Sequence, residues 1–147
     1  MNYSTSKMSY VETYRATVAP SDCDVLGHMN VSRYFAACAD GVFSLQTSLG
    51  LGLDNLTNGR KLSFAVVHAE SDFKAEVHAG SVIYLMTGIA EVGNKSVLFH
   101  HRLFKADGDV LAFETRFKCV LLDLVERKAR SLPPDIREQT EKFLVTP

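Results

Sequence analysis

The sequence feature that most constrains the fold is a change of hydrophobic period along the chain. Between residues 31 and 49, large apolar residues recur every three or four positions, which keeps one face of a helix apolar. After residue 64, apolar and polar residues alternate in segments that are typical of strands. A long helix followed by several strands has to bury its apolar face against a sheet. The pattern therefore predicts an α+β fold.

The expected helix over residues 31–49 has clear end signals. Asn30 is suited to cap its first turn, and Gly50 is a common terminating residue. Gly41 weakens the helix slightly, but the missing side chain allows a neighbouring element to come close. We therefore expect a curved sheet that wraps around this helix and covers it on several sides.

The rest of the chain is expected to form a sheet and one more short helix. Gly93-Asn94 and Asp107-Gly108 are hairpin-type turns, which predicts that the last three strands form an antiparallel meander. Pro133 and Pro134 suit the start of a short C-terminal helix that ends near residue 144. The five expected strands cover residues 10–18, 64–73, 81–92, 96–105 and 110–122. Such a sheet has open edges, so we expect a homodimer or a homotetramer.

Length and composition limit the function classes. The chain has 147 residues, of which 46% are hydrophobic, and this suits a single domain over residues 9–147 behind a flexible extension over residues 1–8. A net charge of -1 gives no electrostatic reason to expect a nucleic-acid partner. No apolar run approaches the roughly 18 residues of a membrane span, and no secretion signal is evident. A protein of the cytoplasm, without a membrane partner, is expected.

Cysteine and histidine positions do not favour a disulfide framework or a metal site. The three cysteines, Cys23, Cys38 and Cys119, are widely separated, and the chain has no Cys-x-x-Cys pair. His100 and His101 are adjacent in an expected strand, where neighbouring side chains point to opposite faces. We therefore expect reduced thiols, and no metal ion shared by this histidine pair.

The segment from Ser21 to Asn30 is the part of the chain most suited to chemistry. It places Asp24, His28 and Asn30 directly before the expected helix, whose first N–H groups have no partners within the helix. A carboxylate and a set of fixed donors would then face the same point. Each residue also has a simpler interpretation: Asp24 as a turn residue, His28 as a local hydrogen-bond partner and Asn30 as a cap. Cys23 near His28 lacks an evident third group for a thiol nucleophile.

Two features make the chain resemble a known family: the element order, and the residues Asp22-Cys23-Asp24, Gly27 and Tyr34. The family is that of the hotdog-fold acyl-CoA thioesterases, specifically the 4-hydroxybenzoyl-CoA thioesterase-like family. The resemblance spans about residues 10–135. It implies a curved five-stranded antiparallel sheet around one long central helix. It also implies that Asp24 is the catalytic carboxylate, that active sites lie at a dimer interface, and that no metal or organic cofactor is needed.

The loop differs from the bacterial 4-hydroxybenzoyl type at Val25 and at His28-Met29-Asn30. The Gly-His-x-Asn pattern is more similar to relatives that act on fatty acyl chains, including plant acyl carrier protein thioesterases, in which the histidine and the asparagine are implicated. The residues expected to contact substrate are Gly27, Met29, Val31 and Tyr34, with Lys95 as a cation for the phosphates of coenzyme A.

The expected reaction is hydrolysis of an acyl-CoA thioester. Asp24 would attack the carbonyl or activate water, and amides around residues 30–32 would hold the developing oxyanion. His28 would orient the water or the acyl group. Two alternatives remain: a hotdog-type dehydratase that uses Asp24 with His28, and a non-catalytic acyl-CoA-binding module.

Overall fold

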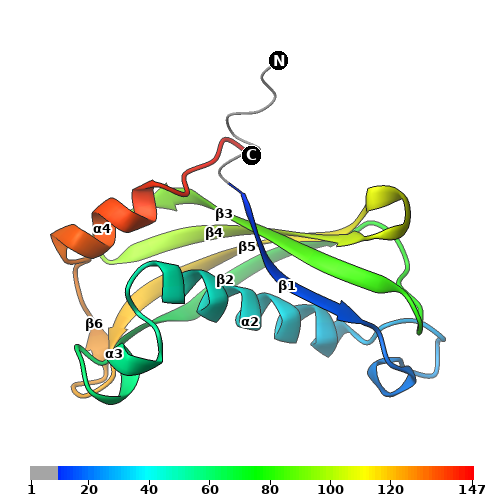
Figure 1. The fold of residues 1–147 in the computed structure, drawn as a ribbon, viewed down its shortest axis with the longest axis horizontal. Coiled ribbons are helices and arrows are strands. Elements are labelled where there is room, and N and C mark those ends of the chain that lie inside the picture. Colours follow the sequence, from blue (N-terminus) through cyan, green and yellow to red (C-terminus); the bar gives the residue numbers. More distant parts are fainter. Residues whose placement is uncertain (1–9) are drawn as a thin grey trace.

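The protein is a single antiparallel sheet with helices, seen in a computed structural model that describes residues 10–147. The flexible extension expected over residues 1–8 lies outside the described residues. The strands are β1 (Val11–Thr17), β2 (Leu62–Phe73), β3 (Val82–Val92), β4 (Ser96–Lys105), β5 (Val110–Asp123) and β6 (Lys128–Ala129). Their order in the sheet is β1-β3-β4-β5-β2, with β6 paired to β5 (Figure 1). The five expected strands and the meander are confirmed; the two-residue β6 was not expected.

The long helix α2 (Val31–Ser48) lies along the concave side of the curved sheet (Figure 1). This arrangement confirms the expected hotdog fold. Two short helices flank it, α3 (Leu53–Thr57) and α4 (Pro134–Glu141). Helix α3 was missed in the sequence because five residues show no helical period. Helix α4 ends before residue 144 because Phe143 and Val145 instead exchange backbone hydrogen bonds with Ile89 of β3.

Helix α2 packs one face into the core. Its buried residues are Tyr34, Ala37, Cys38, Gly41, Val42, Leu45 and Gln46. The close approach expected at Gly41 is confirmed, because a Cβ atom there would lie 2.6 Å from Leu85 Cδ2. The expectation that the sheet covers the helix on several sides is wrong for the single chain. Val31 and Phe43 are 54% and 51% exposed on the other face, which no described element covers.

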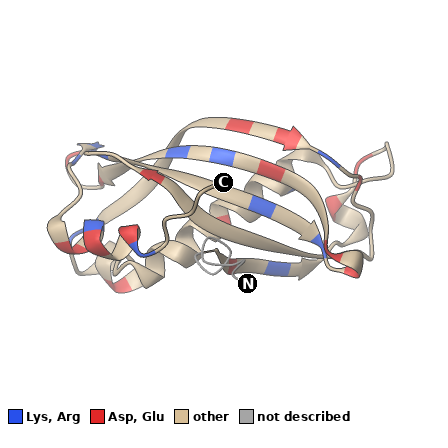
Figure 2. Cartoon of the chain, turned by 90° about the horizontal axis from the view of Figure 1, so that it is seen from above, with Lys and Arg blue, Asp and Glu red and all other residues tan. Residues whose placement is uncertain are grey.

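The two faces of the sheet differ as strand geometry requires. On β4, His101 points inward and bonds Thr87 through Nδ1 (2.8 Å), while His100 points outward and bonds Glu114 through Nε2 (2.9 Å). The expectation that these histidines face apart is confirmed. The outer face carries charged residues of both signs along its strands (Figure 2). Within residues 10–147, no helix is both long and apolar enough to cross a membrane.

Strand pairing gathers several distant segments at one end of the sheet. The Val18 N–H donates to Ser81 O, and the Met29 N–H donates to Val77 O. The loop before α2 therefore lies beside the segments that follow β2 and precede β3. The β3–β4 turn lies at the other end, where the Leu132 N–H donates to Asn94 O and Arg137 donates to Gly93 O.

Candidate active site

The loop over residues 19–30 is fastened at both ends. Asp22 accepts the Ala19 N–H through Oδ2 (2.9 Å) and contacts Arg33 Nε through Oδ1 (3.3 Å). The Asn30 N–H donates to Asp22 O (2.9 Å). These contacts tie the loop to the first turn of α2, and they give Asp22 the role of a loop-fixing residue.

Asp24 occupies a tight turn, and its two carboxylate oxygens have different surroundings. Oδ1 accepts the Leu26 N–H at 2.9 Å, and the Asp24 carbonyl accepts the Gly27 N–H at 3.0 Å. Gly27 has a φ of +88°, a conformation that favours glycine at this position. Asp24 therefore does stabilise the turn. Its second oxygen, Oδ2, has a longer contact of 3.5 Å with Asn30 Nδ2.

Asn30 connects this carboxylate to the helix. Its Oδ1 accepts the Ser32 N–H at 2.9 Å, which confirms the expected capping role. The same side-chain amide donates through Nδ2 to Asp24 Oδ2. One residue thus caps α2 and holds the Asp24 carboxylate near the start of the helix, where the helix dipole favours negative charge.

The free donors at the start of α2 are fewer than expected. Of the amides of residues 30–32, the Asn30 N–H is bonded to Asp22 O and the Ser32 N–H to Asn30 Oδ1. The Val31 N–H has no acceptor among residues 10–147. Because a bonded amide is a poor partner for a developing oxyanion, the donor set narrows to the Val31 N–H.

A cavity of about 370 Å³ lies beside the loop. It is lined by His28, Met29, Val31, Tyr34, Phe73, Lys74, Ala75 and Glu76. Tyr34 packs against Phe73 with ring centroids 5.1 Å apart, and burial raises the pKa of its hydroxyl. His28 is half-buried, and its ring has no hydrogen bond to residues 10–147. Asp24 lies on the adjacent turn and is not part of the cavity wall.

Sequence reasoning missed the end of β2 and the segment after it, residues 73–76, which supply half of the cavity wall. His78 Nδ1 lies 3.0 Å from Gly27 O, and His78 Nε2 lies 3.4 Å from Glu76 Oε1, so this histidine contacts the Asp24 turn. No local pattern marks the segment as part of a site. Its position depends on the backbone hydrogen bond between Met29 and Val77, which joins residues far apart in the sequence.

The structure separates Lys95 from the other expected residues. Lys95 is in the β3–β4 turn, and its carbonyl accepts the Leu121 N–H at the end of the sheet opposite the cavity. Gly27, Met29, Val31 and Tyr34 lie together with Asp24, His28 and Asn30 at the start of α2. The Cys23 thiol donates to Ala19 O at 3.8 Å, which does not support a role as a nucleophile paired with His28.

Comparison with known proteins places this site in context. A family model described as Thioesterase-like superfamily matches residues 18–140. A 1,4-dihydroxy-2-naphthoyl-CoA hydrolase from Synechocystis sp. is 25% identical over 121 residues, which cover 82% of this chain and 88% of that protein. The residues matched by the family model contain the loop, α2 and the whole meander.

Solved structures show the same fold. A 1,4-dihydroxy-2-naphthoyl-CoA thioesterase from Synechocystis has a TM-score of 0.73 and 23% identity, over 86% of this chain and 93% of that chain. A protein from Staphylococcus aureus, solved in complex with CoA, has a TM-score of 0.82 and 19% identity, over 94% of this chain and 87% of that chain.

Proposed function

The chain belongs to the Thioesterase-like superfamily, and on that premise we propose that it hydrolyses an acyl-CoA thioester to a carboxylic acid and coenzyme A. The observation that carries the proposal is the contact between Asp24 Oδ2 and Asn30 Nδ2. It holds a carboxylate at the start of α2, next to the cavity that contains His28 and Tyr34. An acyl group in that cavity would present its carbonyl near this carboxylate.

In the proposed reaction, Asp24 Oδ2 either attacks the thioester carbonyl or removes a proton from an attacking water. The first route forms an anhydride with the enzyme, which water then hydrolyses to regenerate the carboxylate. In both routes the C–S bond breaks, and the sulfur leaves as a thiolate. Little acid assistance is needed, because a thiol pKa is about 8.5.

The Val31 N–H is the proposed donor to the carbonyl oxygen as it gains charge, because it is the amide at this helix start without an acceptor among the described residues. His28 is proposed to orient the water or the acyl group from the cavity wall. The rings of Tyr34 and Phe73 and the side chain of Met29 make that wall largely apolar, which favours an apolar acyl group.

Lys74 lies on the cavity wall, but its Nζ is paired with Glu114 Oε1 at 3.7 Å, so it is not assigned to a phosphate of coenzyme A. Lys95 is at the opposite end of its own sheet, so in this proposal it reaches an active site only from a second copy of the chain. Active sites shared by two protomers would bring Lys95 of one copy to the cavity of the other.

The test is thioester hydrolysis, followed by trapping of the released thiol, with aromatic, short-chain and long-chain acyl-CoA substrates. Asp24→Asn should lower kcat/KM by about 100-fold or more, because it removes the base or nucleophile while keeping the size of the side chain. His28→Ala should lower it less. Asp54→Asn, which changes an exposed carboxylate on α3, serves as the control and should retain wild-type activity.

Undiminished turnover by Asp24→Asn would exclude the role assigned to this carboxylate. Tight binding of acyl-CoA by the wild-type protein without release of thiol would instead identify a non-catalytic binding module. Loss of secondary structure in Asp24→Asn, measured by circular dichroism, would show that the loss of activity comes from the broken turn contact to Leu26. Asp24→Glu would then be used to separate the two roles.

A further inference from the structure

A second concave site lies on the outer face of the sheet, away from α2. It is a groove of about 800 Å³ over β3, β4 and β5. Tyr84 and Met86 come from β3, His100 and Arg102 from β4, and Glu114 from β5. Strand alternation places these side chains opposite the core residues Leu85, His101 and Phe113, so the sheet separates this groove from the cavity beside Asp24.

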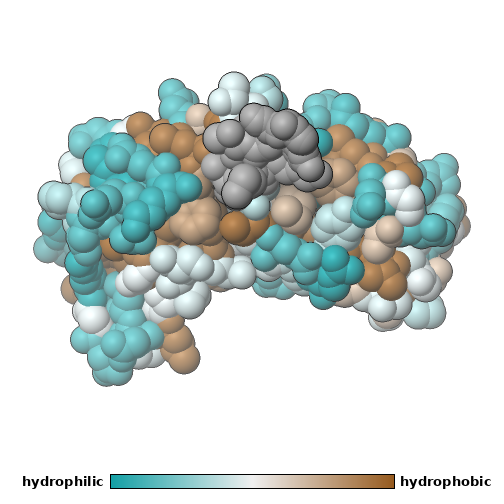
Figure 3. Space-filling model, turned by 45° about the horizontal axis from the view of Figure 1, so that its top comes forward, coloured by the Kyte–Doolittle hydropathy of each residue, from teal (hydrophilic) through white to brown (hydrophobic). Residues whose placement is uncertain are grey.

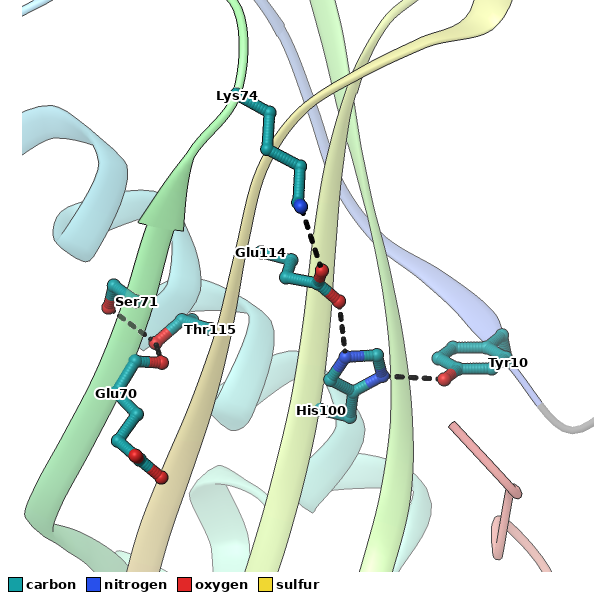
Figure 4. A network of polar contacts seen from close by, with 7 residues as sticks. All are labelled: Tyr10, Glu70, Ser71, Lys74, His100, Glu114 and Thr115. Atoms are coloured by element: carbon teal, nitrogen blue, oxygen red, sulfur yellow. Dashed lines mark hydrogen bonds and ion pairs between the residues drawn. The ribbon is translucent and has the colours of Figure 1, made fainter.

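One side of the groove contains a series of polar contacts that runs from the buried Tyr10–His100 pair to the more exposed Lys74 (Figure 4). The Tyr10 hydroxyl lies 2.5 Å from His100 Nδ1, and His100 Nε2 lies 2.9 Å from Glu114 Oε2. Glu114 Oε1 also has an ion pair with Lys74 Nζ at 3.7 Å. Burial is the main cause that lowers the pKa of His100, so the imidazole is neutral near pH 7. Its Nδ1 therefore accepts from Tyr10, and its Nε2–H donates to Glu114.

These contacts engage the Glu114 carboxylate, which the nearby arginines would otherwise bind. In the β4–β5 register, Arg102 is opposite Glu114 and Arg116 is opposite His100. Neither guanidinium has a carboxylate within 4.0 Å among residues 10–147, whereas Glu114 is engaged by His100 and Lys74. The groove also contains the carboxylates of Asp109 and Glu114, but these are bonded to Tyr84 and to His100 and Lys74. The two guanidinium groups therefore keep donors without a carboxylate partner in the described part of the chain, and an added carboxylate is the simplest partner for them.

The remainder of the groove is mostly aromatic and apolar, and it also contains Thr146 and Asp109, whose Oδ1 accepts the Tyr84 hydroxyl at 2.5 Å. Arg102 Cζ lies 5.2 Å from the centre of the Phe104 ring, and the rings of Phe104 and Tyr84 stack at 5.3 Å. Met86 and Leu111 complete this part of the wall. On the face seen in the space-filling view, hydrophobic residues lie next to hydrophilic ones (Figure 3). The groove therefore has a cationic part and an apolar part, which suits a ligand with the same division.

We propose that this outer groove binds a small organic carboxylate, whose carboxylate group contacts Arg102 and Arg116 and whose apolar body packs on Phe104, Met86 and Leu111. A planar carboxylate matches the fork of donors that a guanidinium presents. The site is separate from the proposed thioesterase site and does not depend on that function.

The test is a titration of the full chain with benzoate, followed by backbone NMR. Saturable shifts should map to β3, β4 and β5 around Tyr84, Arg102 and Arg116. Benzamide, which has the same ring without the charge, and inorganic phosphate, which has charge without an apolar body, should each bind at least about tenfold more weakly. The double variant Arg102→Gln/Arg116→Gln should weaken benzoate binding by about tenfold or more. Lys118→Gln, which removes an exposed cation on β5 outside the groove, should leave benzoate binding unchanged.

Four results would overturn the proposal: no benzoate binding below about 10 mM, shifts confined to residues beside Asp24, phosphate binding as tight as benzoate binding, or equal binding by the double variant. A change of sedimentation in the double variant with unchanged benzoate binding would also overturn it, because it would assign the arginines to a contact between copies. Thermal melts of the double variant and of Lys118→Gln check that each is folded.

Discussion

At the scale of single residues, Asn30 has two separable roles. Its Oδ1 caps α2 through the Ser32 N–H, while its Nδ2 contacts Asp24 Oδ2. A serine at this position can cap a helix but is too short to replace the second contact. Substitutions of Asn30 can therefore separate the stability of the helix from the placement of the carboxylate.

Asn30→Ala should lower the free energy of unfolding by about 1 kcal/mol, the usual value of a lost N-cap, and should also lower kcat/KM. Asn30→Ser should recover most of the stability but not the activity. Urea unfolding and thioester hydrolysis measure the two effects. Full activity in Asn30→Ser would show that the contact of Asn30 with Asp24 has no catalytic importance.

The burial of His101 predicts how the stability of the protein depends on pH. Burial, with a smaller contribution from His100, lowers the pKa of His101 to about 3, and its Nε2 has no partner in the described part of the chain. In the unfolded chain a histidine takes up a proton near pH 6.5. Between these values the unfolded state binds a proton that the folded state does not, so stability falls as the pH falls.

The wild-type protein should lose about 2 kcal/mol of unfolding free energy through His101 between pH 7 and pH 5. His101→Asn should be less stable at pH 7, because it leaves a cavity, but its stability should depend less on pH. His68→Asn on the exposed part of β2 is the control for histidine removal. Urea unfolding at both pH values gives the comparison, and equal pH dependence in wild type and His101→Asn would contradict the assignment.

At the scale of secondary-structure elements, the contact of α2 with the sheet depends on Gly41. A Cβ atom at this position would lie 2.6 Å from Leu85 Cδ2 and 2.9 Å from Thr13 Oγ1. Leu85 is fully buried, and Thr13 is hydrogen-bonded to Thr87, so neither neighbour can move freely. The glycine lets the helix lie close to β1 and β3, and this closeness offsets its low helix propensity.

Gly41→Ala should therefore destabilise the protein by about 1 kcal/mol. The gain of about 1 kcal/mol in helix propensity is smaller than the usual overpacking cost of 1–3 kcal/mol. Ser44→Ala on the exposed face of α2 gains propensity without a clash, and it should be neutral or stabilising. Thermal unfolding compares the two variants. A Gly41→Ala protein more stable than wild type would show that the sheet can move away from the helix.

At the scale of the whole molecule, the single chain has an open side. Strand β2 is an edge of the sheet, and apolar side chains are exposed along it and along the neighbouring face of α2. These residues are Val31, Phe43, Val66, Val67 and Phe73. The cavity beside Asp24 lies at one end of this surface, since Val31 and Phe73 are part of its wall. Exposed edges and apolar patches of this kind are typical of protein interfaces.

We expect the protein to sediment as a dimer or tetramer through this surface. Phe43→Glu should shift it toward the monomer, because a buried charge without a partner is costly, and should lower kcat/KM if the sites are shared. Lys142→Glu, at the exposed end of α4, should change neither property. Sedimentation velocity and hydrolysis assays measure both. A fully active wild-type monomer would contradict sites at an interface.

The sequence by itself determined the elements, and it predicted the loop that carries the candidate site. The period change, the turn pairs and Asn30 with Gly50 predicted α2 and the strands to within two residues at their ends. These features are local, because a cap, a turn or an apolar period depends on residues a few positions apart. The loop over residues 21–30 was proposed as a site for the same reason, together with its resemblance to thioesterases.

Only the tertiary structure decided the strand order, the open face of α2 and the partners of the site. Lys95 proved distant from Asp24, residues 73–76 formed part of the cavity wall, and within residues 10–147 the Val31 N–H was left without an acceptor. The Tyr10–His100–Glu114 contacts likewise join strands far apart in the sequence. Such contacts depend on the register of paired strands and on the fold of the whole sheet, which no short segment of the chain encodes.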